Sequence, residues 1–551
     1  MRPPTTNRNG GLWDLPLDPR VAWTVAISLI LAHIALAWIG RPVGITTIQD
    51  DAHYVLLGQS LRSFHYRDLF LPGAPPHAKY PPGYPAVLAA WGGVGGDGYG
   101  WLVLPSLAAM GGALALVFAG LKRTVSPAFA LLVLAPLSMN PWLVHRSATL
   151  FSEPVFMLLV FLGLWMASGS RGSLRAAAVA GAAIVAASLT RAIGLTLVLA
   201  VAVHWALDGR VRRAVVLAGA AALVVGLWLA WTSLAPTAAV GSSYLADAVA
   251  GRGRPSDLPY VLALAQRVAI RIWQYLTTNL PLRLAIPTIP GTPIDNGLAA
   301  GLMVVGLGPG FVLLTRRWRA GALYLFLYLG LLLLWPWQRG RFVEPILPLL
   351  AAALLLGVGR VAGLLGRRWG LATAAVLSVA LTVAGGVKSV RAAAREAGCE
   401  RLELEGSRDC LSKDHASFFD ALAFARRGLG PGTRLLTVVP EPVYLYTGLP
   451  SVVAKPALRA DPGAFLDYLR SAGATHILLG RLRSSEVHDL EVRIEANCRE
   501  LDVAYADAPR TFIFSIPDSG TAAGDGGACR AIESYRAFNE GGPLPVWLRE
   551  P

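Results

Sequence analysis

Long apolar blocks, separated by polar segments that are mostly short, recur through the first 387 residues of this chain. Each block is long enough to cross a bilayer core of about 30 Å as a helix. We predict eleven spans, near residues 21–40, 99–121, 126–144, 150–168, 174–190, 192–207, 213–234, 296–315, 320–336, 342–360 and 369–387. The first apolar block is long enough to remain as an anchor, so no cleavable signal peptide is expected. Residues 388–551 contain no comparable block. The pattern therefore predicts a polytopic α-helical membrane protein with a soluble C-terminal domain.

Basic residues recur in alternate connections between the predicted spans. Such loops stay in the cytoplasm under the positive-inside rule, which also places residues 1–20 there as a cytoplasmic tail. The remaining connections are then extracytoplasmic, including two long loops at 41–98 and 235–295. An odd number of spans places residues 388–551 outside as well. The basic connections contain Lys122, Arg123, Arg171, Arg175, Arg210, Arg212, Arg213, Arg316, Arg317, Arg319, Arg360, Arg367 and Arg368.

The formal net charge of +15 belongs to one part of the chain. Residues 1–387 contain 29 Lys and Arg but 12 Asp and Glu, whereas residues 388–551 contain 20 and 22. Much of the excess lies in the topological loops, so no nucleic-acid partner is expected. Only 15% of all residues are charged, which makes a purely soluble enzyme a poor fit.

The C-terminal region has the pattern of a small α/β domain. Strand-like runs at 434–439, 451–454, 475–480 and 511–516 alternate with helical patterns at 415–428, 461–472 and 485–499. This alternation predicts a short, mostly parallel sheet flanked by helices. The region has no glycine-rich nucleotide-binding motif.

All four cysteines lie in this C-terminal region. Four cysteines in one extracytoplasmic segment favour two disulfides, although free buried thiols are the alternative. Three pairings are possible, and proximity in sequence favours Cys399–Cys410 and Cys498–Cys529. Metal binding is less favoured, because the cysteines form no CxxC pair.

Two adjacent carboxylates, Asp50 and Asp51, stand where the first predicted span leaves the membrane. The apolar stripe Tyr54, Leu57, Leu61 and Phe64 follows and predicts an amphipathic helix along the membrane surface. A carboxylate there can act as a general base on an acceptor. The alternative is that the pair caps the helix N-terminus.

The same loop ends in the segment from His77 to Pro85, where Lys79 stands among prolines and tyrosines. The prolines restrict the backbone and would present Lys79 stiffly to a lipid phosphate. The alternative is an ordinary interfacial lysine within an aromatic belt. We expect His53, Tyr54, Tyr80 and Tyr84 to line the substrate cavity.

Further charged residues mark the outer ends of later spans. Glu153 opens an apolar span, which is costly unless the acid has a function or benefits from the helix dipole. Arg191 is extracytoplasmic by the predicted topology and therefore calls for an anionic partner, such as Glu153 or a phosphate. Arg339 and Arg341 could bind phosphate oxygens, whereas Glu344 is expected to pair with an arginine. The sequence indicates no metal ligand set, but it leaves a divalent cation open.

Five of these segments together resemble the GT-C glycosyltransferase superfamily, in particular bacterial enzymes related to the aminoarabinose and protein-mannosyl transferases. The segments share their order and their predicted outer side, and a soluble outer domain after the last span also fits. They are Asp50–Tyr54, Lys79–Pro85, Ser152–Pro154, Leu189–Arg191 and Arg339–Phe342, the last running into Pro345 and Pro348.

The resemblance implies a GT-C-like fold and an inverting sugar transfer from a polyprenyl-phosphate-linked donor at the outer face of a bacterial inner membrane. It assigns the catalytic acid to Asp50 and the lipid phosphate to Lys79. Asp51 takes the neighbouring catalytic position, where many members have Glu. Glu153 is then the second-loop acid that assists at the active site, where many members have Asp. The acceptor can be a glycan, a lipid or a protein. The rivals are a transporter or flippase of lipid-linked sugars and a non-catalytic scaffold.

Overall fold

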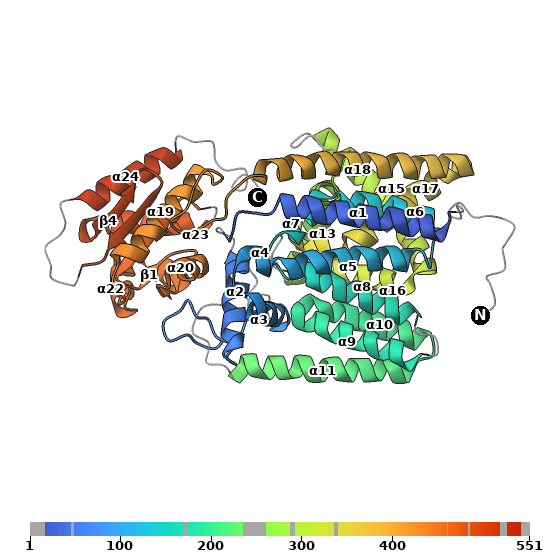
Figure 1. Ribbon diagram of the computed structural model, residues 1–551, viewed down its shortest axis with the longest axis horizontal. Helices are drawn as coiled ribbons and strands as arrows, with labels where there is room; N and C mark the ends of the chain where they lie inside the picture. Colours follow the sequence, from blue (N-terminus) through green and yellow to red (C-terminus); the bar gives the residue numbers. More distant parts are fainter. Residues whose placement is uncertain are drawn as a thin grey trace.

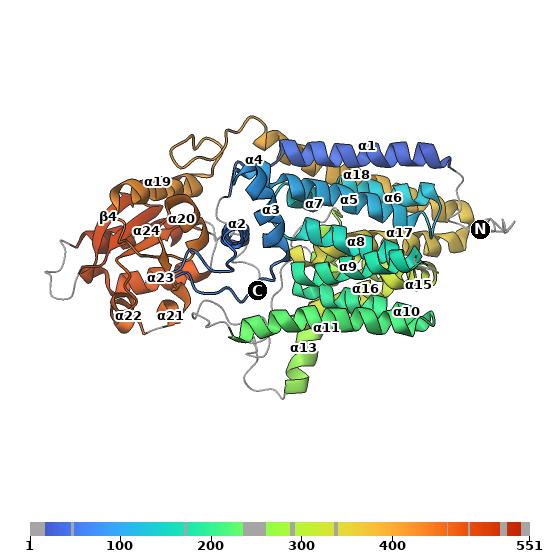
Figure 2. The same cartoon turned by 60° about the horizontal axis from the view of Figure 1, so that its bottom comes forward.

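In a computed structural model, a long bundle of helices carries a separate α/β domain at one end (Figure 1). The structure describes residues 17–45, 49–169, 173–234, 260–286, 293–335, 340–459, 461–482, 485–517 and 526–540. A short layer of helices, α2 (Gln49–Arg62), α3 (Gly83–Gly95) and α4 (Tyr99–Leu102), lies between the bundle and the domain (Figures 1 and 2).

The bundle consists of apolar helices, most of them joined by short connections. Its helices are α1 (Pro19–Ile39), α5 (Leu104–Leu121), α6 (Pro127–Ser138), α7 (Pro141–Ser147), α8 (Glu153–Gly169), α9 (Leu174–Thr190), α10 (Leu195–Leu207), α11 (Val211–Leu234), α15 (Pro293–Arg317), α16 (Arg319–Leu334), α17 (Leu347–Ala362) and α18 (Arg367–Glu396). Short helical turns at Ala192–Gly194, Gly340–Ile346 and Gly363–Leu365 adjoin them. The second outer loop contains α13 (Tyr260–Gln274), a π-helical segment Tyr275–Asn279 and α14 (Leu280–Arg283), none of which was predicted.

The structure is that of a multi-pass membrane protein. Among the described residues, six helices are long and apolar enough to cross a membrane, or seven if the bent pair α6 and α7 counts as one span. Asn140 caps the start of α7 at this 68° bend, just before Pro141. Four further apolar helices are shorter, with 10–17 residues. Each predicted range overlaps one of these helices, and the count of eleven spans stays a prediction.

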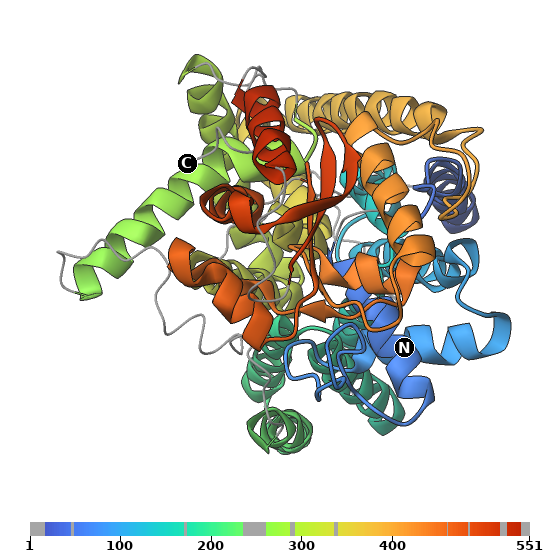
Figure 3. The same ribbon diagram turned by 90° about the vertical axis from the view of Figure 1, so that its left-hand side faces the viewer.

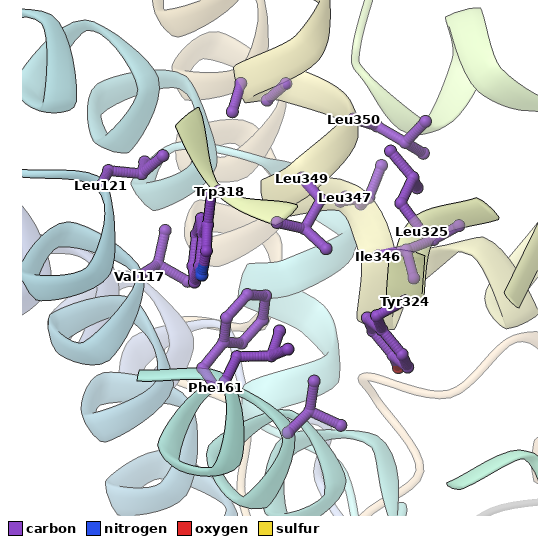
Figure 4. Packing of buried hydrophobic residues seen from close by; sticks show 14 of the residues in the cluster. Val117, Leu121, Phe161, Trp318, Tyr324, Leu325, Ile346, Leu347, Leu349 and Leu350 are labelled. Carbon is purple, nitrogen blue, oxygen red and sulfur yellow. The ribbon is translucent and has the colours of Figure 1, made fainter. Parts of the chain in front are cut away.

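Large apolar side chains fill the interior of the bundle. Trp318, Phe161 and Tyr324 pack with leucines of α5, α16 and α17 (Figure 4). Small residues let α15 and α17 approach closely, as is usual between membrane helices. A Cβ atom at Gly310 would lie 1.7 Å from the carbonyl oxygen of Ala353, and one at Gly357 would lie 1.7 Å from that of Gly306. Side chains at these two positions would therefore separate the helices.

The basic connections gather at the end of the bundle that carries the N-terminus (Figure 1). Arg123 donates to the carbonyl oxygen of Trp165, and Arg317 donates to that of Thr124. Arg319 forms an ion pair with Asp208 at 3.0 Å. These contacts join four connections that are far apart in the sequence, so this end of the molecule is the basic end.

Helix α2 differs from the predicted surface helix. It begins at Gln49, so Asp50 and Asp51 lie in its first turn and not before it. Residues 51–58 are buried on all sides, because α2 packs against α3 and against the C-terminal domain. Phe64 is 98% exposed and has a φ of 57°, outside the helix, so its place in an apolar stripe was predicted wrongly.

The C-terminal domain has a five-stranded sheet of order β2-β1-β3-β5-β4. Its strands are β1 (Leu435–Leu436), β2 (Ser451–Val452), β3 (His476–Gly480), β4 (Asp502–Asp507) and β5 (Thr511–Ser515). Its main helices are α19 (Lys413–Gly428), α20 (Pro440–Thr447), α21 (Ala454–Arg459), α22 (Phe465–Ser471), α23 (Ser485–Ala496) and α24 (Gly527–Glu540). Strand β1 pairs in parallel with β2 and β3, but β5 is antiparallel to β3 and β4. The prediction of a mostly parallel sheet was therefore wrong for the second half.

Two disulfides close loops in this region. Cys399 pairs with Cys410 and Cys498 with Cys529, with Cα–Cα distances of 5.8 and 4.9 Å. This confirms the pairing that sequence proximity favoured. The first disulfide lies between α18 and α19, where the chain enters the C-terminal domain.

The C-terminal domain lies over the end of the bundle opposite the basic end (Figure 3). Three hydrogen bonds fasten it to the first outer loop. The Tyr446 hydroxyl donates to the carbonyl oxygen of Ile45 at 2.6 Å. The backbone N–H of Ser451 donates to Phe70, and that of Leu402 donates to Val43.

Candidate active site

Asp50 lies between a phenol and a guanidinium group. The Tyr80 hydroxyl donates to its Oδ1 at 2.8 Å, and Arg341 forms an ion pair with its Oδ2. Arg341 comes from the turn before α17, almost 300 residues along the chain, so the fold brings two ends of the bundle sequence together here. Both side chains are largely buried, with exposures of 15% and 18%.

Lys79 lies next to this pair without an ion pair of its own among the described residues. Its ammonium lies 5.1 Å from the centre of the Tyr80 ring. The Tyr66 hydroxyl donates to the carbonyl oxygen of Tyr80 at 2.7 Å, which holds the Lys79–Tyr80 segment in place. Lys79 is therefore a positive charge that an anionic ligand can use.

The two neighbouring carboxylates have opposite electrostatics. Burial alone would raise the pKa of Asp50, but the charges of Arg341 and Lys79 hold it well below its ordinary value. Burial raises the pKa of Asp51 to about 8, and the charge of Asp50 adds to this effect. Asp50 is thus ionised at neutral pH, while Asp51 tends to keep its proton.

Glu153 is fully buried at the start of α8 and is paired with Arg191. The Arg191 Nη1 lies 2.7 Å from Glu153 Oε1 and donates to the Ser152 hydroxyl at 2.9 Å. The Tyr54 hydroxyl contacts the same Ser152 hydroxyl at 3.3 Å. The sequence left two anionic partners open for Arg191, Glu153 or a phosphate, and in the structure Arg191 pairs with Glu153.

Glu344 forms a second buried ion cluster. Arg146 donates to its Oε2 at 2.8 Å, and Arg283 lies 3.0 Å from its Oε1. The prediction that Glu344 pairs with an arginine is confirmed. With two cations on one carboxylate, this cluster fixes α7, α14 and the turn before α17 to one another.

A third cluster links the outer loop to the C-terminal domain. His53 Nε2 and His77 Nδ1 lie 2.8 and 2.7 Å from the same oxygen, Asp68 Oδ1. His53 Nδ1 lies 3.3 Å from Glu441 Oε1, which belongs to α20. All four side chains are buried.

His53, Asp68 and His77 also have the residue types and spacing of a metal site, with candidate ligand atoms within 4.8 Å of one another. The two nitrogens of His77 are already used, however. The backbone N–H of Tyr80 donates to His77 Nε2 at 2.7 Å, so the proton of the neutral ring lies on Nδ1 and points to Asp68. A metal ion on Nδ1 would move the ring proton to Nε2, because the neutral ring carries one proton. Nε2 could then no longer accept from the Tyr80 N–H. The cluster therefore fits a hydrogen-bond network better than a metal.

The structure brings most of the predicted site residues to one end of the bundle. Asp50, Lys79, Tyr80 and Arg341 form one group, and Tyr54 joins Glu153 and Arg191 in the next. Tyr84 is fully buried behind Tyr54, with ring centres 5.0 Å apart, and its hydroxyl contacts Ser106. Arg339 lies outside the described residues.

Sequence reasoning gave no role to four residues of these clusters. Arg146 was not singled out, although it lies in a predicted outer connection. Arg283, Asp68 and Glu441 had no sequence signal, because each lies in a polar or mixed segment and its partner is far away in the sequence.

No protein-family model and no curated protein sequence matches this chain. Solved structures with a similar fold do exist. ArnT from Cupriavidus metallidurans bound to undecaprenyl phosphate has a TM-score of 0.54 at 13% identity, over 90% of this chain and 98% of that one. Its apo state has a TM-score of 0.53 at 13% identity, with the same coverage.

A second similar structure is the Archaeoglobus fulgidus oligosaccharyltransferase tethered with an acceptor peptide containing the NVT sequon. Its TM-score is 0.51 at 12% identity, over 91% of this chain and 75% of that one. Both likenesses extend over at least 90% of this chain, so it shares the fold of these two proteins, as the resemblance of the five sequence segments implied. At such low identity the likeness establishes the fold, and activity needs its own argument.

Proposed function

We propose that this protein is a glycosyltransferase that moves a sugar, hexosyl or pentosyl, from a polyprenyl-phosphate-linked donor to an acceptor. The observation that carries the proposal is the position of Asp50 between Tyr80 and Arg341, with Lys79 beside it. A base next to two cations suits a reaction in which a hydroxyl or amine attacks and a phosphate leaves. The shared fold with ArnT, solved with undecaprenyl phosphate, supports the class of donor.

The cations would act on the leaving phosphate. Phosphate oxygens bind guanidinium groups strongly, so a donor phosphate at Lys79 would compete with Asp50 for Arg341. As Arg341 turns to the phosphate, Asp50 loses its nearest positive charge, and its pKa rises towards that of a useful base. Binding of the donor would therefore activate the base.

The chemical step is a single displacement with inversion. The acceptor oxygen or nitrogen attacks the anomeric carbon and gives its proton to Asp50. The bond from this carbon to the phosphate oxygen breaks, and its electron pair leaves with the polyprenyl phosphate. Lys79 and Arg341 stabilise the charge that develops there. Glu153 would assist from behind the site by holding Arg191, which donates to Ser152 next to Tyr54.

The proposed location is the extracytoplasmic face of a bacterial inner membrane. The basic end would lie in the cytoplasm with the N-terminus, in line with the positive-inside rule. The site and the C-terminal domain lie at the opposite end (Figure 1). The two disulfides in that domain support an oxidising compartment. The acceptor, whether glycan, lipid or protein, would reach the site from this side.

The central test is Asp50→Asn in proteoliposomes supplied with lipid-linked sugar. We expect sugar transfer to fall by about two orders of magnitude or more, because the amide cannot take the proton. The matched control is Asp97→Asn, since Asp97 also pairs with an arginine, Arg62, in the same outer loop. Near wild-type transfer by Asp50→Asn would contradict the assignment. Movement of intact donor across sealed vesicles, without product, would favour the transporter instead.

A further inference from the structure

A continuous row of hydrogen-bonded groups runs from the C-terminal domain to Asp50. It begins at Glu441 of α20, which faces His53 Nδ1 at 3.3 Å. His53 Nε2 faces Asp68 at 2.8 Å, and Asp68 accepts from His77 Nδ1 at 2.7 Å. The row continues through Tyr80, whose backbone N–H donates to His77 and whose hydroxyl donates to Asp50.

Two members of this row, His77 and Tyr80, are held by further contacts. His77 is fixed by its ring contacts and also by its backbone, since its N–H donates to Tyr66 at 2.8 Å. Its carbonyl oxygen accepts from the Trp231 indole of α11 at 2.9 Å. Tyr80 stacks on His77, with an angle of 17° between the rings. The segment that carries Tyr80 therefore has little freedom while the row is intact.

His53 is the member that depends on the C-terminal domain. Its two nitrogens face two carboxylates, Asp68 of the outer loop and Glu441 of the C-terminal domain. The rings of Phe70, His77 and Tyr80 pack around it. Burial by itself would lower the pKa of His53, but these carboxylates raise it to about 9. A protonated imidazole donates to both sides and so joins the two parts of the molecule.

His53 is also linked to Asp50 directly through helix α2. The two residues lie one turn apart on α2, so whatever fixes His53 fixes the first turn of that helix. Asp50 is thus held from two directions, through the helix and through Tyr80.

We propose that Glu441 is a positioning residue for Asp50, so that the base is held in its reactive position only while the C-terminal domain is docked on the outer loop. Glu441 touches neither the donor nor the reacting atoms and acts through His53, Asp68, His77 and Tyr80. The kinetic part of this inference rests on the proposed function.

The test compares Glu441→Ala, Glu441→Gln and Glu441→Asp in full-length protein. The alanine loses the contact, the glutamine keeps its shape without charge, and the aspartate keeps the charge. We expect Glu441→Ala to lower kcat about tenfold, since hydrogen bonds to charged groups are strong, while the KM for the donor stays within about twofold. Activity should rise through the glutamine variant to the aspartate variant.

The matched control is Glu491→Ala. Glu491 is a buried acid of the same domain with similar exposure, 7% against 8%, but it pairs with Arg536 away from the outer loop. We expect its kcat per folded protein to stay within about twofold of wild type, as for substitutions away from a site. Equal losses in the two alanine variants, or no loss in Glu441→Ala, would overturn the proposal.

A second measurement does not depend on sugar transfer. Carbodiimide labelling of Asp50, read by mass spectrometry against Asp97 as internal reference, reports how tightly Asp50 is held. We expect labelling to increase severalfold in Glu441→Ala and to be unchanged in Glu491→Ala. If wild-type protein transfers no sugar, the proposed function fails, and unchanged labelling of Asp50 would separately refute the positioning role.

Metal binding by the histidine cluster is the alternative that the experiment must separate. If zinc raises the melting temperature of wild-type protein but not of Asp68→Asn, and chelation lowers kcat, the cluster holds a metal and the network proposal is wrong. Identical melting temperatures and kcat with zinc or chelator support the network.

Discussion

The two ends of the bundle both contain arginines, but they use them differently. At the basic end, Arg123 and Arg317 donate to backbone carbonyl oxygens, and Arg319 remains 47% exposed beside Asp208. At the opposite end, Arg146 and Arg191 are 9% and 14% exposed, and each pairs with a fully buried glutamate. The arginines at the basic end lose little solvation energy, because water still reaches them. The buried arginines at the opposite end need complete pairing or a function, because an unpaired buried charge strongly destabilises the fold.

This difference also separates the acids at the site end. Glu344 is fully buried, and each of its two carboxylate oxygens contacts an arginine. Asp50 has one arginine, one phenol and a nearby lysine that can bind something else. Fully satisfied pairs hold helices together, whereas an exchangeable pair can take part in chemistry.

Among variants that compare the two ends of the bundle, we expect Arg341→Gln to have the largest effect on kcat. We expect kcat for sugar transfer to fall about a hundredfold, as when one group that stabilises a transition-state charge is removed. Arg319→Gln, which removes a cation from the basic end, should leave kcat within about twofold. The measurement is steady-state transfer in proteoliposomes at matched protein content. A similar loss in both variants would break the distinction between the two ends.

A large effect of another kind is expected from Glu344→Gln. It leaves Arg146 and Arg283 without a buried anion, which should destabilise the fold by about 3 kcal/mol. Thermal unfolding in detergent measures this loss, and we expect kcat per folded protein to change much less. If stability were unchanged while kcat collapsed, Glu344 would belong to the chemistry and not to the framework.

The last prediction concerns Asp51 and the pH dependence of stability. Its pKa is raised to about 8 by burial, so the folded protein keeps a proton that the unfolded chain has lost above about pH 4. The unfolded state then binds fewer protons, and stability falls as the pH rises from about 4 to about 8. We expect the melting temperature of Asp51→Asn to fall less over this range than that of wild type. Parallel curves for the two proteins would show that Asp51 is not held protonated.

Much of the bundle could be predicted because hydrophobic length is a local property of the sequence. The bend between α6 and α7 falls at Asn140-Pro141, inside the span predicted at 126–144. Strand β4 was missed, since its Asp502–Asp507 segment has an aspartate at each end, is only partly buried and pairs only at the sheet edge. The antiparallel half of the sheet depends on that strand and so was missed with it.

The candidate site was predicted in part for a similar reason. Asp50, Lys79, Glu153 and Arg191 stand out because charges are rare near apolar spans and because their segments resemble a known superfamily. The network through Asp68 and Glu441 could not be found in this way. Its members are ordinary polar residues, and they come into contact only when the C-terminal domain docks on the first outer loop.

The hydrogen bond between Tyr446 and Ile45 joins residues 401 positions apart. A ribosome adds about 5–20 residues per second, so the first outer loop waits about 20–80 s for its partner. During that time α2 has no C-terminal domain to pack against, and Glu441 does not yet exist to contact His53. The arrangement that we propose to be catalytic is therefore completed late in biosynthesis. Chains that end before the C-terminal domain would enter the membrane without activity.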